Sequence, residues 1–277
     1  METKCDIIIY GSDKMKLLDL NIGIKLDNTK EVLDFIKSEN ADICTFQEAM
    51  NAVDDSCFDI FKSKNDIVKL EQYKYNEFAP LFIADCITKN NIVVRDFGGK
   101  AEQGLLTISK YKIKEHYNQF YYNDYKYEYD ATYFREKDWC RSIQNAILEI
   151  DGKEIQIINV HGIWNKDKIG DERTINQSEF ILSKIRKDIP VIVVGDFNLL
   201  PNTESLKILN KELINLIEEY DIKSTRPNFD DGLDSGNIVC DYIFVNDKIK
   251  VNDFKVINTD ISDHLPLLLD FDIKEEI

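Results

Sequence analysis

The octapeptide Val191–Asn198, Val-Ile-Val-Val-Gly-Asp-Phe-Asn, is the stretch from which the fold is inferred. Four successive β-branched residues are typical of a buried strand, and Gly195 marks the end of that strand. Asp196 and Asn198 lie two residues apart, so both side chains leave the same face of an extended chain. An Asx turn that merely closes a strand explains the octapeptide equally well. A functional site is favoured because strands followed by an acidic residue recur elsewhere in the chain.

Alternating and helical hydrophobic patterns outline the other elements. Strands are expected over 16–23, 43–46, 92–94, 102–109, 143–149, 155–161, 241–245, 251–257 and 267–271, and helices over 29–39, 171–187, 201–209 and 213–220. Little is assigned to residues 54–84 beyond a short helix, because that segment is poorly periodic. The strand over 155–161 carries apolar residues on both faces, which predicts a sheet covered on both sides. The order strand, helix, strand at the start of the chain predicts a helix lying on that sheet.

The composition is that of an ordinary globular protein. The chain has 277 residues, of which 43% are hydrophobic and 31% charged, with no linker, low-complexity tract or clear repeat, so one domain spanning 1–277 is expected. No apolar run approaches the length needed to span a bilayer, and the N-terminus lacks the pattern of a secretory signal. The six cysteines are dispersed without a Cys-x-x-Cys pair. This usage favours reduced thiols and predicts a cytoplasmic protein.

The formal net charge of −16 bears on the choice of partner. Binding to nucleic acid by counterion release requires a basic face, so this charge argues against tight, non-specific binding. A nucleic-acid substrate is still compatible with the charge, because acidic residues gathered around a metal ion count toward the total while the metal screens them locally.

Acidic and polar side chains stand at the ends or beginnings of the expected strands. They are Asn21, Glu48, Glu102, His161, Asp196, Asn198, Asp241, Asp263 and His264. Taken singly, Asp241 and Asp263 are equally well explained as turn residues, and His264 as a structural histidine. If the strands share one sheet system, these ends converge on one oxygen-rich rim. Oxygen ligands suit Mg²⁺, Mn²⁺ or Ca²⁺ better than zinc, and the chain has no His-Glu-x-x-His motif.

In their order along the chain, these residues resemble the motifs of the endonuclease/exonuclease/phosphatase superfamily. The resemblance is carried by Asn21, Gln47-Glu48, His161, Gly195-Asp196-Phe197-Asn198, Asp241-Tyr242 and Ser262-Asp263-His264, and it extends from about residue 16 to residue 272. It implies the α/β fold of deoxyribonuclease I, a four-layer α/β sandwich. In that fold two mixed β-sheets pack face to face, with helices on the outside.

The resemblance also implies roles for individual residues. Glu48 would be the principal ligand of a divalent metal ion, Mg²⁺ or alternatively Mn²⁺. Asn21 and Asp263 would assist Glu48 in binding this ion. Asp196 would orient or deprotonate the attacking water, or bind a second metal. Asn198 would donate a hydrogen bond to a phosphate oxygen.

The two histidines at strand ends would flank the scissile phosphate, His161 oriented by Glu102 and His264 oriented by Asp241. An imidazole beside a carboxylate has a raised pKa, so it can be cationic near neutrality and stabilise the charge of the transition state. Arg141 matches an arginine that contacts phosphate in the deoxyribonuclease branch.

The function that the resemblance implies is that of a divalent-metal-dependent phosphoesterase, foremost a phosphodiesterase or nuclease acting on nucleic acid or a nucleotide-like diester. One alternative substrate is a phospholipid or inositol phosphate, with the aromatic tract Tyr117–Tyr133 docking on a lipid surface. Another alternative is a catalytically silent scaffold, although no stable protein partner is implied. His161 distinguishes the chain from the exonuclease III branch, which usually has Tyr there. The segment 162–168 matches no subfamily signature, so the substrate stays open.

Overall fold

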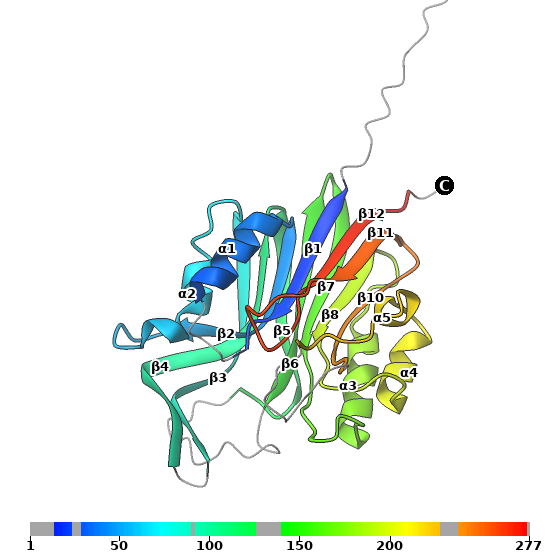
Figure 1. Cartoon of the computed structure of the whole chain (residues 1–277). Helices are drawn as coiled ribbons and strands as arrows, with labels where there is room; N and C mark the ends of the chain where they lie inside the picture. Colours follow the sequence, from blue (N-terminus) through cyan, green and yellow to red (C-terminus); the bar gives the residue numbers. More distant parts are fainter. Residues whose placement is uncertain (1–13, 24–28, 90–91, 126–139, 228–237, 276–277) are drawn as a thin grey trace, which may run out of the picture.

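Two mixed six-stranded β-sheets, with helices on their outer sides, make up the protein (Figure 1). The computed structural model describes residues 14–23, 29–89, 92–125, 140–227 and 238–275. The apolar core between the sheets combines residues from both, such as Leu17 and Leu269 from one sheet and Ile157 and Ile192 from the other. The four-layer α/β sandwich of the deoxyribonuclease I type, expected from the sequence, is confirmed.

The first sheet, called sheet A here, holds both the first and the last strand of the described residues. Its strand order is β11-β12-β1-β2-β4-β3. The strands are β1 (Met15–Asn21), β2 (Ile43–Ala52), β3 (Tyr75–Lys89), β4 (Ile92–Ser109), β11 (Ile249–Val256) and β12 (Leu267–Ile273). The pair β1 and β2 is parallel and the other pairs are antiparallel, so the sheet is mixed.

The second sheet, sheet B, contains the strand discussed first. Its order is β5-β6-β7-β8-β10-β9, and only β7 and β8 run parallel. The strands are β5 (Lys112–Tyr122), β6 (Arg141–Ile150), β7 (Lys153–His161), β8 (Val191–Asp196), β9 (Ile214–Asn215) and β10 (Asp241–Val245).

Helices cover the outer face of each sheet (Figure 1). Beside sheet A lie α1 (Thr29–Glu39), α2 (Ser63–Ile67) and the short 3₁₀ helix η2 (Asp59–Phe61), and beside sheet B lie α3 (Glu172–Ser183), α4 (Glu204–Asn210) and α5 (Leu216–Glu219). A capping box at Asp171 and Thr174 begins α3, so backbone N–H groups at its first turn are satisfied. No helix in the described residues is long and apolar enough to cross a membrane.

Successive side chains of β1 point to opposite faces of sheet A and therefore lie in two different environments. Leu18 and Leu20 pack with Val32 and Ile36 of α1 on the outer face of sheet A, whereas Leu17 belongs to the core between the sheets. Because side chains alternate along a strand, Asp19 and Asn21 share the inward face with Leu17. The space between the sheets therefore changes from apolar to polar toward the C-terminal end of β1.

The polar end of this interior is a hydrogen-bonded network that joins the two sheets. Thr45 Oγ1 and Gln47 Nε2 donate to Asp19 Oδ1 at 2.7 and 2.9 Å. Gln47 Nε2 also donates to Asn159 Oδ1 on β7 at 2.8 Å, across the sheet interface. Asn159 Nδ2 in turn donates to Gln144 Oε1 on β6 at 3.2 Å. All five side chains are buried, so these bonds replace the water that their polar groups lose on folding.

Sheet A departs from the sequence expectation at its far edge. The segment left largely unassigned includes β3, whose pairing with β4 shifts register between Pro80 and Phe82 and again beyond Ala84. Such irregularities break the two-residue alternation that sequence patterns detect. Residues 92–94 and 102–109, expected as two strands, belong to the single strand β4, which continues through Gly98 although this glycine has a left-handed φ of +74°.

The aromatic tract belongs to an edge strand over part of its length. Tyr117, Tyr121 and Tyr122 lie on β5, which pairs with β6 at the edge of sheet B. Tyr127, Tyr129 and Tyr133 lie outside the described residues.

The buried carboxyl group of Asp19 makes stability depend on pH. Burial raises the pKa of Asp19 from 3.8 to about 7, although the hydrogen bonds from Gln47 and Thr45 lower it. The native state therefore binds this proton more tightly than the unfolded state, and the stabilisation is full below about pH 4 and lost as the pH rises through 7. We expect Asp19→Asn to abolish this dependence, which amounts to on the order of a few kcal/mol in unfolding free energy.

Urea unfolding of the wild type and of Asp19→Asn between about pH 4 and 8 measures this difference. The exposed residue Asp55 provides the control, since Asp55→Asn is expected to follow the wild-type curve. Parallel curves for the wild type and Asp19→Asn would contradict the assignment.

Candidate active site

The pairing of the central strands brings the predicted site residues together. In sheet B, His161 at the end of β7 pairs with Asp196 at the end of β8, and Asp241 at the start of β10 pairs with Asp196 from the other side. In sheet A, Asn21 at the end of β1 pairs with Gln47, the neighbour of Glu48. The strand ends that carry Asn21, His161, Asp196 and Asp241 thus lie at one rim, as expected.

The carboxylate of Asp196 lies at the centre of this rim. Its Oδ2 accepts a hydrogen bond from Asn21 Nδ2 at 3.1 Å, and its Oδ1 accepts one from the backbone N–H of Asn198 at 2.8 Å. The Nε2 atoms of His161 and His264 lie 3.9 and 3.7 Å from Oδ2. Burial raises the pKa of Asp196, and the charges of His264 and Lys168 oppose this rise.

Gly195 allows β8 to bring Asp196 to this position. Its φ is +135°, and a Cβ atom there would lie 2.1 Å from the carbonyl oxygen of Val160 on β7. Any side chain would therefore push the two strands apart just before the site.

Glu48 is aimed into the site by an irregularity in β2. The register between β2 and β4 shifts between Phe46 and Ala49, which marks a β-bulge, and Glu48 has a left-handed φ of 57°. A non-glycine residue in this region is uncommon, and bulges occur often beside active sites because they redirect a side chain. Glu48 Oε1 thereby comes within 3.5 Å of Asn21 Nδ2 and 3.8 Å of His161 Nε2.

Asp263 is presented by a loop that is fastened to the end of β1. Ser262 Oγ donates to the carbonyl oxygens of Asn21 and Ile22 at 2.7 and 3.0 Å. Asp263 Oδ1 packs against Gly23 so closely that a Cβ atom on Gly23 would lie 2.2 Å from it. The same oxygen is buried and has no hydrogen-bond partner in the described part of the chain.

The oxygen atoms around Asp263 fit a divalent cation. Burial raises the pKa of Glu48, and the negative charge of Asp263 raises it further. A cation beside these two carboxyl groups would favour the ionised form of Glu48 and supply a partner for the Asp263 oxygen that lacks one. Asn21, Glu48 and Asp263 offer only oxygen atoms as ligands, which is the donor set of Mg²⁺, Mn²⁺ or Ca²⁺.

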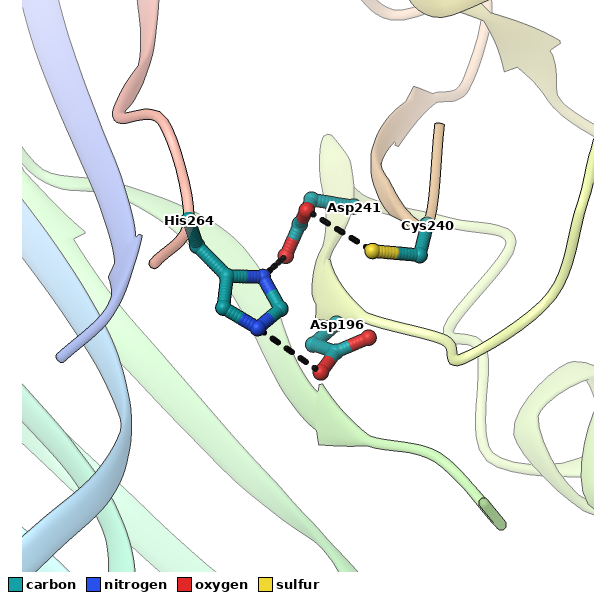
Figure 2. Close-up of side chains that lie close together, drawn as sticks. All are labelled: Asp196, Cys240, Asp241 and His264. Carbon is teal, nitrogen blue, oxygen red and sulfur yellow. Dashed lines mark hydrogen bonds and ion pairs between the residues drawn. The ribbon is translucent and has the colours of Figure 1, made fainter. Parts of the chain in front are cut away.

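His264 and Asp241 form a buried imidazole–carboxylate pair (Figure 2). His264 Nδ1 lies 2.8 Å from Asp241 Oδ1, while Thr225 Oγ1 donates to Asp241 Oδ2 at 2.6 Å. Burial alone would lower the pKa of His264, but the charges of Asp241 and Asp196 raise it well above 6.5. Burial alone would raise the pKa of Asp241, but the charge and hydrogen bond of His264 lower it. The two carboxylates therefore favour the protonated form of the His264 ring.

His161 differs from the expectation in two respects. Its pKa is well below 6.5, because burial disfavours the charged ring and the charges of Arg141, His264 and Lys168 add to that effect. Its Nδ1 has no hydrogen-bond partner among the described residues, so Glu102 does not orient it. Glu102 instead accepts hydrogen bonds from Asn51 at 2.7 Å and Tyr125 at 2.9 Å. The expected Glu102–His161 pair is therefore wrong in this structure.

Arg141 is buried beside the backbone that follows His161. Its Nε donates to the carbonyl oxygen of Gly162 at 2.7 Å, and its Nη1 donates to the carbonyl oxygen of Cys140 at 3.0 Å. These bonds place the guanidinium group under the backbone that follows His161. The expected contact between Arg141 and phosphate stays a prediction.

Two further cations at the site were not identified from the sequence. Arg226 contacts His264 Nε2, and its Nη2 lies 3.5 Å from Asp263 Oδ2. Lys168 Nζ donates to Asn198 Oδ1 at 3.1 Å. Lys168 lies in the segment 162–168, which matches no subfamily signature, and none of the family motifs includes Arg226. The sequence gives no other signal for either contact, because both depend on where loops fold back.

A second group of potential metal ligands overlaps with the His264–Asp241 pair (Figure 2). Asp196, Cys240, Asp241 and His264 are all buried, and one ligand atom from each lies within 4.8 Å of the others. A set with a thiol and an imidazole is typical of zinc. However, both oxygens of Asp241 are already engaged, Oδ1 with His264 and Oδ2 with Thr225 and the Cys240 thiol. The oxygen set around Asp263 is therefore the better candidate for a metal.

Comparison with known families agrees with this geometry. The sequence model of the Endonuclease/Exonuclease/phosphatase family matches residues 21–264, which include every residue of the rim. The chain belongs to this family. Members of the family are phosphoester hydrolases that use divalent metals.

Solved structures with the same fold come from diverse organisms. An endonuclease/exonuclease/phosphatase family protein from Leptotrichia buccalis has a TM-score of 0.66 at 20% identity, and the match covers 94% of this chain and 100% of that one. A mannosyl-6-phosphatase from Bacteroides thetaiotaomicron has a TM-score of 0.65 at 16% identity, with 94% and 100% covered. Truncated TDP2 from Caenorhabditis elegans has a TM-score of 0.64 at 18% identity, with 94% and 97% covered.

These identities are low, so the likenesses show the shared fold and nothing finer. No curated protein matches the sequence of this chain.

The opposite environments of the two site histidines predict opposite charge states near neutrality. We expect His264 to remain protonated and His161 to be neutral at about pH 7. Asp241→Asn should lower the pKa of His264, because the largest opposite charge is removed. NMR titration of the imidazole resonances of the metal-free protein measures both values.

His116, which lies on β5 beside Glu77, serves as the internal control for this titration. Its pKa should not change in the Asp241→Asn variant. A His161 ring that loses its proton at a higher pH than the His264 ring would contradict the assignment.

Proposed function

We propose that the protein is a Mg²⁺-dependent phosphoesterase, with Mn²⁺ as an alternative cation, that hydrolyses phosphodiesters of nucleic acid or of nucleotide-like molecules. One observation supports this proposal above all others. The Asp196 carboxylate is surrounded by Asn21, His161, Asn198 and His264, which come from strand ends and loops of both sheets. This is a rigid arrangement for placing a water molecule beside a phosphorus centre.

Asn21, Glu48 and Asp263 would hold the metal. When bound, the cation would neutralise charge on the phosphate and polarise its phosphorus–oxygen bonds. The orphaned oxygen of Asp263 and the raised pKa of Glu48 support this assignment.

The remaining residues would have separate roles in hydrolysis. Asp196, fixed by the backbone N–H of Asn198, would accept a proton from the attacking water. The His264 imidazolium, held by Asp241, would stabilise negative charge that develops on the phosphate oxygens. The neutral His161 would keep its Nε2 facing Glu48 and Asp196. Asn198 and Arg141 would contact phosphate oxygens.

A phospholipid or inositol phosphate is the second candidate substrate. Tyr117 on the edge strand β5 is 49% exposed, as a residue that docks on a lipid surface would be. The name of the Bacteroides thetaiotaomicron protein, a mannosyl-6-phosphatase, supports including phosphomonoesters in a substrate panel.

We also propose that the protein works in the cytoplasm as one domain, without a stable protein partner. The dispersed cysteines support a reducing compartment, and Cys44, Cys57 and Cys240 are buried thiols.

Hydrolytic activity tests the proposal directly. With Mg²⁺ or Mn²⁺ we expect hydrolysis of bis-p-nitrophenyl phosphate, and a loss of at least about 100-fold in kcat/KM for Glu48→Gln and for His264→Ala. His116→Ala is the matched control for His264→Ala, because His116 lies outside the site, and it should keep full activity.

A panel of single- and double-stranded DNA, RNA, nucleotides, sphingomyelin, inositol phosphates and sugar phosphates would then identify the preferred substrate. A folded wild-type protein that hydrolyses none of these compounds with either metal would overturn the proposal and favour a binding scaffold.

Metal titration separates the two candidate ligand groups. Calorimetry with Mg²⁺ or Mn²⁺ should show binding to the wild type, and we expect Glu48→Gln and Asp263→Asn to abolish it. Cys240→Ser should bind the metal as the wild type does, because Cys240 belongs only to the other group. Binding that survives in Glu48→Gln and disappears in Cys240→Ser would assign the metal to the group around Asp241.

A further inference from the structure

Lys168 places a buried positive charge beside the proposed site. Only 9% of this residue is exposed, and its Nζ donates one hydrogen bond, to Asn198 Oδ1 at 3.1 Å. No carboxylate in the described part of the chain lies within ion-pairing distance of this ammonium group. An ammonium group has three donors, and burying it without a countercharge is unfavourable. Two of the three N–H donors of Lys168 therefore have no hydrogen-bond partner among the described residues.

The backbone around Lys168 is fixed, so the position of its side chain is defined. The N–H of Lys168 donates to the carbonyl oxygen of Asn165 at 3.2 Å, and its own carbonyl oxygen accepts from the N–H of Leu200 at 2.8 Å. Lys168 also has a left-handed φ of 56°. This conformation is uncommon for a lysine, and such strain persists mainly where the surrounding structure enforces it, often at functional sites.

Lys168 also fixes the orientation of the Asn198 amide. Asn198 Oδ1 accepts from the ammonium group, so Asn198 Nδ2 is turned toward Asp196 Oδ2 at 3.3 Å and the carbonyl oxygen of Gly162 at 3.4 Å. A flipped amide would place N–H donors against the ammonium donors. The amide donor of Asn198 is thereby kept on the side of the Asp196 carboxylate.

We propose that Lys168 is an additional phosphate-binding residue, which directs the Asn198 amide and offers its remaining N–H donors to an oxygen of the substrate phosphate. This inference rests on the proposed function and extends it. It adds to the phosphate subsite a positively charged residue, Lys168, that belongs to none of the family motifs given above. Lys168 and His264 both act electrostatically on Asp196, so a phosphate bound against Asp196 would experience two positive charges.

Binding of inorganic phosphate tests the inference without relying on turnover. In the presence of Mn²⁺, we expect Lys168→Met to weaken phosphate binding by about 10-fold or more in calorimetry, because a buried charge-assisted hydrogen bond is lost. Lys168→Arg, which keeps the charge, should restore part of the affinity. Lys166→Met is the matched control, because Lys166 is exposed in the same loop, and it should bind phosphate as the wild type does.

Kinetics on the best phosphoester substrate provide the second measurement. Lys168→Met should lower kcat/KM by about 10- to 100-fold. If Lys168 and Asn198 act as one unit, the double variant Lys168→Met/Asn198→Ala should lose scarcely more than Asn198→Ala alone.

The possible outcomes separate this inference from the proposed function. A folded Lys168→Met protein with wild-type phosphate affinity and wild-type kcat/KM overturns the role of Lys168. A wild-type protein that binds phosphate through Lys168 but hydrolyses no phosphoester overturns the proposed function and leaves the binding residue in place. Thermal unfolding monitors the fold, and Lys168→Gln replaces Lys168→Met if the methionine variant does not fold.

Discussion

The arrangement of the site depends on the hydrogen bonds that the side-chain amide of Gln47 donates. This amide joins Asp19 of sheet A to Asn159 of sheet B by two hydrogen bonds within the buried interior. Apolar contacts between sheets are non-directional and do not by themselves fix how one sheet lies along the other. Hydrogen bonds in a buried network have strict geometry, so the sheets are held in one relative position. Glu48 on sheet A and Asp196 on sheet B depend on that position.

Much of the fold and of the site was predictable, because apolar runs and strand ends are local features of the sequence. The run before Gly195 forms β8, and Asp196 follows it at the rim. The contact between Asp241 and His264 was expected only from the family resemblance, since the two residues belong to different elements. The protonation state of His161 could not be predicted from local sequence, because it depends on burial and on three surrounding cations.

The features that escaped prediction depend on pairing between distant segments. Glu102 was expected beside His161, but β4 is a single long strand with several register shifts, and Glu102 lies opposite Asn51 on β2. The bulge that aims Glu48 exists only when β2 pairs with β4. Lys168 is buried because its loop is hydrogen-bonded to Leu200 beyond β8. No periodicity in the sequence reports such contacts.

The position of β12 has a consequence for how the protein is synthesised. This last strand pairs with β1, the first strand of sheet A, and the loop just before it carries Asp263 and His264. During translation β1 therefore lacks its neighbour on that side until β12 has left the ribosome. An unpaired strand edge can join other chains, so chaperones would protect the nascent chain in this interval, and the site is completed only after Asp263 and His264 have been made.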